Sequence, residues 1–192
     1  MSSKPRLLDY DQVVVRLKSG DESAYQLIVS EWHGRIFNFA LRYSNDRYFA
    51  TEVVQKTFIQ VFEKIDQLNE ASKLKPWIYR IASNCCATEG RKRKRNQHAT
   101  LDQEMMSRID PATPATEYEL QEVKNTVKEV LQMIPIEQRK VIIMKEFEGL
   151  KFREIAEITG ESENTVKSRM YYGLDAMRKI LNQKKIEKGI LL

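Results

Sequence analysis

Residues 152–179 read F-R-E-I-A-E-I-T-G-E-S-E-N-T-V-K-S-R-M-Y-Y-G-L-D-A-M-R-K, and this stretch predicts two short helices that cross over a glycine turn. Ile155 and Ile158 recur at helical spacing and give the first helix an apolar face. Gly160 supplies the left-handed backbone conformation that a tight turn requires. Ser162 stands where a helix N-cap belongs, so a second helix is expected to follow it. This pattern is typical of a DNA-binding helix-turn-helix.

The second predicted helix divides by helical period into an apolar and a polar face. The apolar face carries Val166, Met170, Leu174 and Met177. The polar face and its flanks carry side chains that hydrogen-bond base edges or phosphates. The candidate DNA contacts on this predicted recognition helix are Asn164, Thr165, Lys167, Ser168, Arg169 and Tyr172. An amphipathic helix pair in an ordinary bundle would give a similar pattern, so the segment alone leaves that alternative open.

Length, composition and charge fit two small helical cores and a polyanionic partner. The chain has 192 residues, 42% of them hydrophobic, and a formal net charge of +5. No apolar run approaches the length of a membrane span, and the N-terminal M-S-S-K-P-R lacks the apolar core of a signal peptide. We therefore expect a cytoplasmic protein without membrane insertion.

Cysteine usage argues against a disulfide framework and a metal site. Cys85 and Cys86 are the two cysteines of the chain and are adjacent in sequence, unlike a four-ligand zinc pattern. We expect reduced thiols, no metal and no cofactor.

The pattern of the whole chain predicts an all-α fold of two small helical domains. Residues 10–96 are expected to form about four helices and residues 118–185 about four more. Residues 97–117 lose helical periodicity, contain prolines and turn acidic, which predicts a flexible linker. In the second domain, Pro135 is expected in the first turn of a helix and Gly149 just past its end.

The first domain contains a second candidate nucleic-acid surface. Residues 75–95 read K-P-W-I-Y-R-I-A-S-N-C-C-A-T-E-G-R-K-R-K-R. At helical period, Trp77, Arg80 and Asn84 share a stripe that leads into the basic run at 91–95. Single-stranded nucleic acid suits such a surface, because aromatic rings stack on bases and cations meet phosphates. Packing of Trp77 and simple solvation of the basic run remain alternatives.

Six blocks in this order and spacing resemble an extracytoplasmic function (group IV) sigma factor of bacterial RNA polymerase over nearly the whole chain. The blocks are L-K-S-G-D-E-S-A-Y (17–25), A-T-E-V-V-Q-K-T-F (50–58), K-P-W-I-Y-R-I-A-S-N (75–84), I-P-I-E-Q-R-K-V (134–141), E-G-L-K-F-R-E-I-A (148–156) and T-V-K-S-R (165–169). The resemblance implies that the two domains are sigma regions 2 and 4, and that the protein is a monomer and not an enzyme.

The resemblance also implies partners and contact residues. Core RNA polymerase would be bound through the clamp helices of its largest subunit and the flap of the second largest, with docking residues Glu52, Val54, Gln55 and Phe58. The melted −10 element of promoter DNA would be captured by Leu68, Asn69, Trp77, Arg80, Asn84, Arg91, Lys92 and Arg93. The polar face of the recognition helix would read the −35 element. An anti-sigma factor is the expected regulator.

Several positions depart from the usual pattern of that family. Acidic residues are common where this chain has Thr51 and Lys56, an aromatic residue is usual at Leu68, and an acidic one is common at Thr88. These departures predict a rearranged clamp contact and a shifted promoter preference. Lys151 stands where a Ser or Thr cap is frequent, which costs roughly 1 kcal/mol of helix stability if nothing replaces the cap.

Three other classes of function were weighed against the sigma-factor interpretation. An enzyme would have to use His33, His98 or the two cysteines, none of which has a partner at catalytic spacing. An operator-binding regulator would act independently of core polymerase and would bind duplex tightly alone. An interaction protein held by a partner overlaps with the sigma-factor interpretation.

Overall fold

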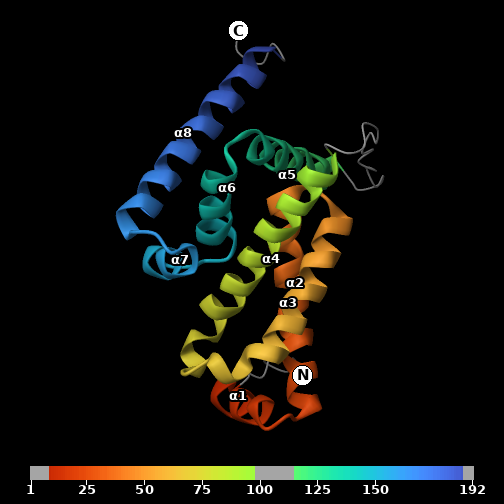
Figure 1. Ribbon diagram of the computed structural model, residues 1–192. Coiled ribbons are helices and arrows are strands. Elements are labelled where there is room, and N and C mark those ends of the chain that lie inside the picture. The colour runs from red at the N-terminus through yellow and green to blue at the C-terminus, as the bar shows by residue number, and fades with distance from the viewer. Residues whose placement is uncertain (1–8, 98–114, 188–192) are drawn as a thin grey trace.

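The computed structural model describes residues 9–97 and 115–187, and these residues form an all-α fold without a strand (Figure 1). The predicted fold class is confirmed. The first four helices, here called the N-terminal half, are α1 (Tyr10–Lys18), α2 (Glu22–Ser44), α3 (Arg47–Lys64) and α4 (Leu74–Gln97), with the short turns η1 (Ile65–Gln67) and η2 (Ala71–Lys73) before α4. The C-terminal half contains α5 (Ala115–Met133), α6 (Ile136–Ile142), η3 (Ile143–Phe147), α7 (Phe152–Thr159) and α8 (Glu163–Glu187).

Aspartates begin three helices of the N-terminal half. The carboxylates of Asp9, Asp21 and Asp46 accept backbone N–H groups at the starts of α1, α2 and α3, for example from Phe49 to Asp46 at 3.0 Å. An acceptor here satisfies amides that have no partner inside the helix. These caps fix where each helix of the bundle starts.

The core of the N-terminal half is built around an aromatic cluster. The Tyr79 ring of α4 packs edge-on against Trp32 at 6.0 Å and Phe39 at 5.5 Å between ring centroids. All three side chains are buried, and edge-to-face packing adds to the free energy gained by burying their area. Tyr79 is therefore fixed in the core from which its hydroxyl group reaches outward.

The C-terminal half contains a widened helical turn between α6 and α7. Pro135 directly precedes α6, one position before the predicted first turn. The segment η3 is π-helical, and after it the Glu148 N–H donates to the carbonyl of Ile143 at 3.2 Å. Gly149 follows in the left-handed region with φ +64°, as expected for the residue past a helix end.

The two halves pack directly against each other. In Figure 1, α7 lies beside the lower part of α4, and α5 and α6 lie near the end of α2. Two side chains of the C-terminal half donate to backbone carbonyls at the end of α2: Gln132 to Arg42 at 2.7 Å and Arg139 to Tyr43 at 2.8 Å. The helix α8 covers α6 on the far side from the N-terminal half.

The predicted linker 97–117 lies mostly outside the described residues, because α4 ends at Gln97 and α5 begins at Ala115. Its expected flexibility and the exact domain boundaries stay predictions.

Candidate nucleic-acid interface

The turn between α7 and α8 has the geometry of a helix-turn-helix. Gly160 adopts φ +70°, and its N–H donates to the Ala156 carbonyl at 2.9 Å to close α7. The Ser162 hydroxyl then accepts the Thr165 N–H at 3.1 Å and caps α8, as the sequence predicted. At the other end of α7, Glu154 accepts the Lys151 N–H at 2.6 Å, so the cap lost at Lys151 is partly replaced.

The outward side of α8, here called the α8 face, is open to solvent in its first turns. Asn164, Thr165, Ser168 and Tyr172 are exposed, as is Tyr171. These groups are free to meet a major groove or its phosphates. The sequence therefore placed the polar side of this helix correctly.

Two cations of the α8 face are held by carboxylates of the same half. Arg169 pairs with Glu137 at 3.2 Å and with Glu161 at 2.7 Å. Lys167 pairs with Glu163 at 2.8 Å, one helical turn earlier. Any phosphate that binds these cations has to replace or share their present partners.

The apolar side of α8 differs from the prediction at one position. Val166, Met170 and Met177 are buried, but Leu174 is 42% exposed. Gly173 takes the inward position instead: a Cβ built there would lie 2.7 Å from Ile142 Cδ1 of α6. The close approach of two helices at a glycine turns the neighbouring Leu174 away from the core.

Four of the candidate −10 residues line one pocket at the start of α4, here called the α4 pocket. It has a volume of about 230 Å³, and its lining includes Leu68, Asn69, Trp77 and Arg80. Trp77 is half-buried, whereas Asn69 and Arg80 are exposed. An aromatic ring, an amide and a guanidinium around one opening can stack on a base, hydrogen-bond its edge and neutralise a phosphate.

Leu68 is a floor of this pocket and not an exposed contact. Its side chain is 3% exposed and belongs to the apolar core under the loop between η1 and η2. The prediction that residues 66–72 form a wholly surface loop is therefore wrong at Leu68, because this lone apolar side chain fills the core beneath the polar loop.

The C-terminal half borders the α4 pocket. Glu157 of α7 is part of the lining, and the Arg80 Nη2 atom donates to the Glu157 carbonyl at 3.0 Å. The sequence gave no signal for this contact, because the two residues are far apart in the chain and neither stands out in a local pattern.

Of the other candidate −10 residues, Asn84, Arg91 and Lys92 are exposed on α4 beyond the pocket. Arg93 differs, because it forms an ion pair with the buried cap Asp46 and lies over the Phe49 ring at 5.0 Å. Arg93 is thus held by the bundle, and Arg91 and Lys92 are the more accessible cations of the run.

The candidate docking helix α3 presents a polar outer side over a buried one. Val54 and Phe58 are each 5% exposed, so they support the helix from below, whereas Gln55 is exposed. Lys56 bridges Glu52 at 3.3 Å and Glu89 of α4 at 2.8 Å.

Glu89 is a buried charge that the sequence analysis missed. Burial works against its charged form, but hydrogen bonds and charge from Lys56 and Lys92 hold the pKa of this carboxyl below its ordinary value. Lys56 thus ties the docking helix to α4, in a place where relatives of the suspected family commonly carry an acidic residue.

A buried polar cluster joins the two halves at Glu148, which the sequence analysis also missed. The side chain of Glu148 is 7% exposed, accepts the Tyr79 hydroxyl and lies 3.6 Å from Arg42 Nη1. The Lys75 ammonium donates to the Glu148 backbone carbonyl at 2.6 Å. Burial raises the pKa of Glu148, and burial together with the nearby carboxylate raises the pKa of Tyr79.

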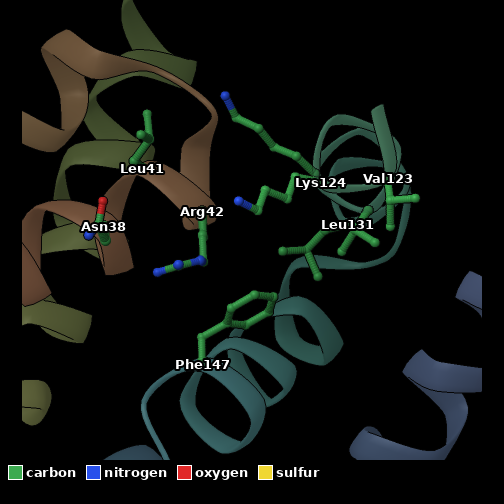
Figure 2. A pocket seen from close by; sticks show the side chains of 9 residues that line it. Asn38, Leu41, Arg42, Val123, Lys124, Leu131 and Phe147 are labelled. Carbon is green, nitrogen blue, oxygen red and sulfur yellow. The ribbon is translucent and has the colours of Figure 1, made fainter. Parts of the chain in front are cut away.

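An apolar groove of about 430 Å³ lies between α2 and α5 (Figure 2). Figure 2 shows Leu41 and Arg42 of α2 facing Leu131 of α5, with Phe147 below them. Arg42, Lys124 and Lys128 supply positive charge around the apolar lining. Because its walls come from both halves, the groove exists only while the halves are packed together.

The catalytic and metal-site alternatives gain no support from the described residues. His33 is exposed on α2, and His98 lies outside the described ranges. Within 9–97 and 115–187 there is no group of three His, Cys, Asp or Glu residues placed to hold a metal ion. In the same ranges no helix is both long and apolar enough to cross a membrane. Cys85 and Cys86 are both free and buried.

Comparison with known proteins gives two family matches along the chain. Residues 28–96 match the model for Sigma-70 region 2, and residues 124–177 match the model for Sigma-70, region 4. The ECF RNA polymerase sigma factor SigW of Bacillus subtilis is 30% identical over 178 residues, which cover 88% of this chain and 94% of SigW. The ECF RNA polymerase sigma-E factor of Haemophilus influenzae is 29% identical over 170 residues, covering 84% and 89%.

Solved structures show the same fold. The sigma factor RpoE of Bartonella quintana, solved in complex with the anti-sigma factor NepR, matches with a TM-score of 0.69 and 26% identity, covering 82% of this chain and 96% of that one. CnrH, solved in complex with the cytosolic domain of CnrY, has a TM-score of 0.64 at 20% identity, covering 91% and 99%.

Proposed function

The chain belongs to the ECF sigma factors of the sigma-70 family, and we propose that it divides promoter recognition between the α8 face and the α4 pocket. It acts as an alternative sigma factor that directs RNA polymerase to promoters. In this proposal residues 10–96 serve as region 2, residues 118–185 as region 4 and residues 97–117 as their linker, the organisation of group IV.

The α8 face is assigned to the −35 element as duplex DNA. Asn164, Thr165 and Ser168 are exposed near the start of the helix, where a recognition helix meets base edges. Tyr172 lies one turn further along, and the cations Lys167 and Arg169 would meet phosphates after exchanging their carboxylate partners.

The α4 pocket is assigned to one flipped base of the melted −10 element, and this pocket is the observation that carries the proposal. Asn69 and Arg80 would hydrogen-bond the base and its phosphate, and Trp77 would stack. Unstacking a base costs a few kcal/mol, so a pocket that rewards one base converts melting into sequence selection. Asn84, Arg91 and Lys92 continue the same side of α4 and would follow the strand.

Core RNA polymerase is the assembly partner in this proposal. Glu52 and Gln55 would contact the clamp helices of the largest subunit, while Val54 and Phe58 hold the helix in place. The flap of the second largest subunit would bind the C-terminal half. The role is not catalytic, and it places the protein in the cytoplasm, where RNA polymerase works.

Run-off transcription tests the proposal directly. Purified core RNA polymerase is given a genomic promoter library with and without the chain. Transcripts that depend on the chain and share a two-part upstream sequence are the expected result. Tight duplex binding by the chain alone, together with no binding to core polymerase, would instead favour the operator-binding alternative.

An anti-sigma factor is the proposed regulator, and the groove in Figure 2 is the proposed contact. The related RpoE of Bartonella quintana was solved with such a partner. The apolar lining with Arg42, Lys124 and Lys128 at its edge suits an amphipathic helix that carries acidic residues. Since both halves form the groove, its occupant would hold them together.

The groove assignment predicts a selective loss of repression. Val127→Glu places a charge in the apolar lining and should relieve repression by the anti-sigma factor of a reporter that depends on the chain, with little change in unrepressed transcription. Val15→Glu, at an exposed apolar position on α1, is the control. Equal repression of both variants would place the contact elsewhere.

A further inference from the structure

The C-terminal half holds the α4 side of the N-terminal half through one buried residue. Glu148 is contacted by three side chains of the other half: Arg42 from α2, and Lys75 and Tyr79 from α4. Its carboxylate is almost fully buried, so the groups that replace its water matter for stability. We call these interactions the Glu148 contact.

The Glu148 contact places α7 over the α4 pocket. Two turns along from it, Arg80 is held by the Glu157 carbonyl, and Glu157 lines the pocket. Arg80 is the guanidinium assigned to DNA above, so a single donor has two mutually exclusive uses. Trp77, Asn69 and Arg80 therefore share their opening with a helix of the same chain.

The α8 face has no comparable cover. Asn164, Ser168 and Tyr172 are exposed in the same conformation, and the carboxylates near Arg169 and Lys167 belong to its own half. The packing of the two halves thus affects one proposed DNA surface and spares the other.

We propose that the free protein is self-inhibited at the α4 pocket: the Glu148 contact keeps α7 over the single-strand surface, and the halves must separate there before α4 can hold melted DNA. This inference rests on the proposed function for the identity of the ligand. The α8 face stays available to duplex DNA throughout, so inhibition applies to melted-strand capture and not to duplex contact.

The size of the effect follows from population arithmetic. A ligand that binds only the open form has an apparent dissociation constant equal to its intrinsic one divided by the open fraction. Removing one hydrogen bond to a charged, buried acceptor shifts such an equilibrium by about tenfold. While the closed form still dominates, the affinity for single strands rises by the same factor.

The experiment compares Tyr79→Phe with Tyr25→Phe in the full chain. Tyr79→Phe keeps the core ring but removes the hydroxyl that Glu148 accepts, whereas the Tyr25 hydroxyl donates to Phe58 at 3.3 Å within the N-terminal half. Small-angle X-ray scattering measures the radius of gyration. Fluorescence anisotropy measures binding to a short labelled single strand of randomised sequence and to a randomised duplex.

The expected result is separate for the two variants and the two probes. Tyr79→Phe should enlarge the radius of gyration and tighten single-strand binding at least fivefold, with duplex binding unchanged within about twofold. Tyr25→Phe should change none of these quantities. An unchanged radius in Tyr79→Phe overturns the inference, and so does an enlarged radius without a gain in single-strand binding.

A second variant guards against a folding defect in the aromatic core. Glu148→Ala removes the acceptor from the other half, leaves Tyr79 in place and should give the same two changes; if circular dichroism shows that Tyr79→Phe is misfolded, Glu148→Ala decides. Transcription by the wild-type chain with core polymerase is measured in parallel. Its absence would defeat the proposed function, whereas the scattering still reports on the Glu148 contact.

Discussion

The two proposed DNA surfaces of this protein are presented in opposite ways. The α8 face is open, and its cations are paired within their own half. The α4 pocket is bordered by α7, and its guanidinium at Arg80 is bonded across the two halves. Duplex DNA exists before a promoter is opened and single strands only afterwards. The difference therefore suggests that access to each surface is matched to the stage at which its DNA becomes available.

The largest expected effect comes from Arg139, which anchors the C-terminal half. Its guanidinium donates to the carbonyls of Tyr43, Gln132 and Ile134 and to the Gln132 side chain at 2.5 to 3.2 Å. Arg139→Ala leaves several acceptors without a donor and should lower the free energy of unfolding by about 3 kcal/mol. Chemical denaturation measures the loss, and hydrogen exchange should locate it in α5 and α6.

A matched surface change sharpens that result. Arg153 on α7 is highly exposed and makes only a long ion pair with Glu157 at 3.5 Å. Arg153→Ala should stay within about 0.5 kcal/mol of the wild type. Similar losses for both variants would mean that Arg139 does not anchor the C-terminal half.

The next effect concerns the close approach of α8 and α6. Gly173→Val adds carbon where a Cβ already meets Ile142 Cδ1 at 2.7 Å and Gln138 Cβ at 3.1 Å, and should cost about 2 kcal/mol. Gly34→Val in α2 meets nothing within 4 Å and should be nearly neutral. Hydrogen exchange should show weakened protection in α6 and α8, with α1 to α4 unaffected; weakening spread evenly over both halves contradicts the prediction.

A smaller effect separates the two surfaces in transcription. Lys167→Ala should reduce initiation about tenfold on an intact −35 element and make little further difference once that element is mutated. Asn84→Ala should show the same pattern for the −10 element and spare the −35 element. Run-off assays on paired promoter mutants measure both. If each variant is equally sensitive to both elements, the assignment of one surface to each element is wrong.

The smallest effect lies in the basic run of α4. Lys92→Gln should lower the slope of log affinity against log salt for single strands by roughly 0.7, the value for one phosphate contact. Arg93→Gln should change this slope less, because Arg93 is engaged by Asp46. Anisotropy titrations over a range of salt concentrations measure the slopes. A larger change at Arg93 would show that this ion pair opens when DNA binds.

Helices and caps of this fold were predictable because their causes are local. Gly160, Ser162 and Gly149 each act on neighbouring backbone groups, and the structure places all three as the sequence indicated. Leu174 and Leu68 were assigned wrongly because burial at those points depends on other elements: Gly173 meets α6, and a polar loop lies over an apolar gap.

The candidate site was predictable in part for the same reason. Trp77 and Arg80 are one turn apart on a helix, so their shared pocket follows from helical period. The contacts of Glu148 and Glu157 join residues 69 and 77 positions apart, and no local pattern marks them. Long-range polar pairs of this kind leave no trace in the spacing of either partner.

The π-helical turn η3 makes the Glu148 contact depend on chain length as well as on side-chain identity. A π-turn holds one more residue than an α-turn, and each residue rotates a helix by about 100°. Deleting one residue from Ile143–Phe147 would let the turn relax to ordinary α-helix and swing Glu148 away from Tyr79 while every contacting side chain is retained. A single-codon deletion there would therefore free the α4 pocket without altering any residue that touches DNA.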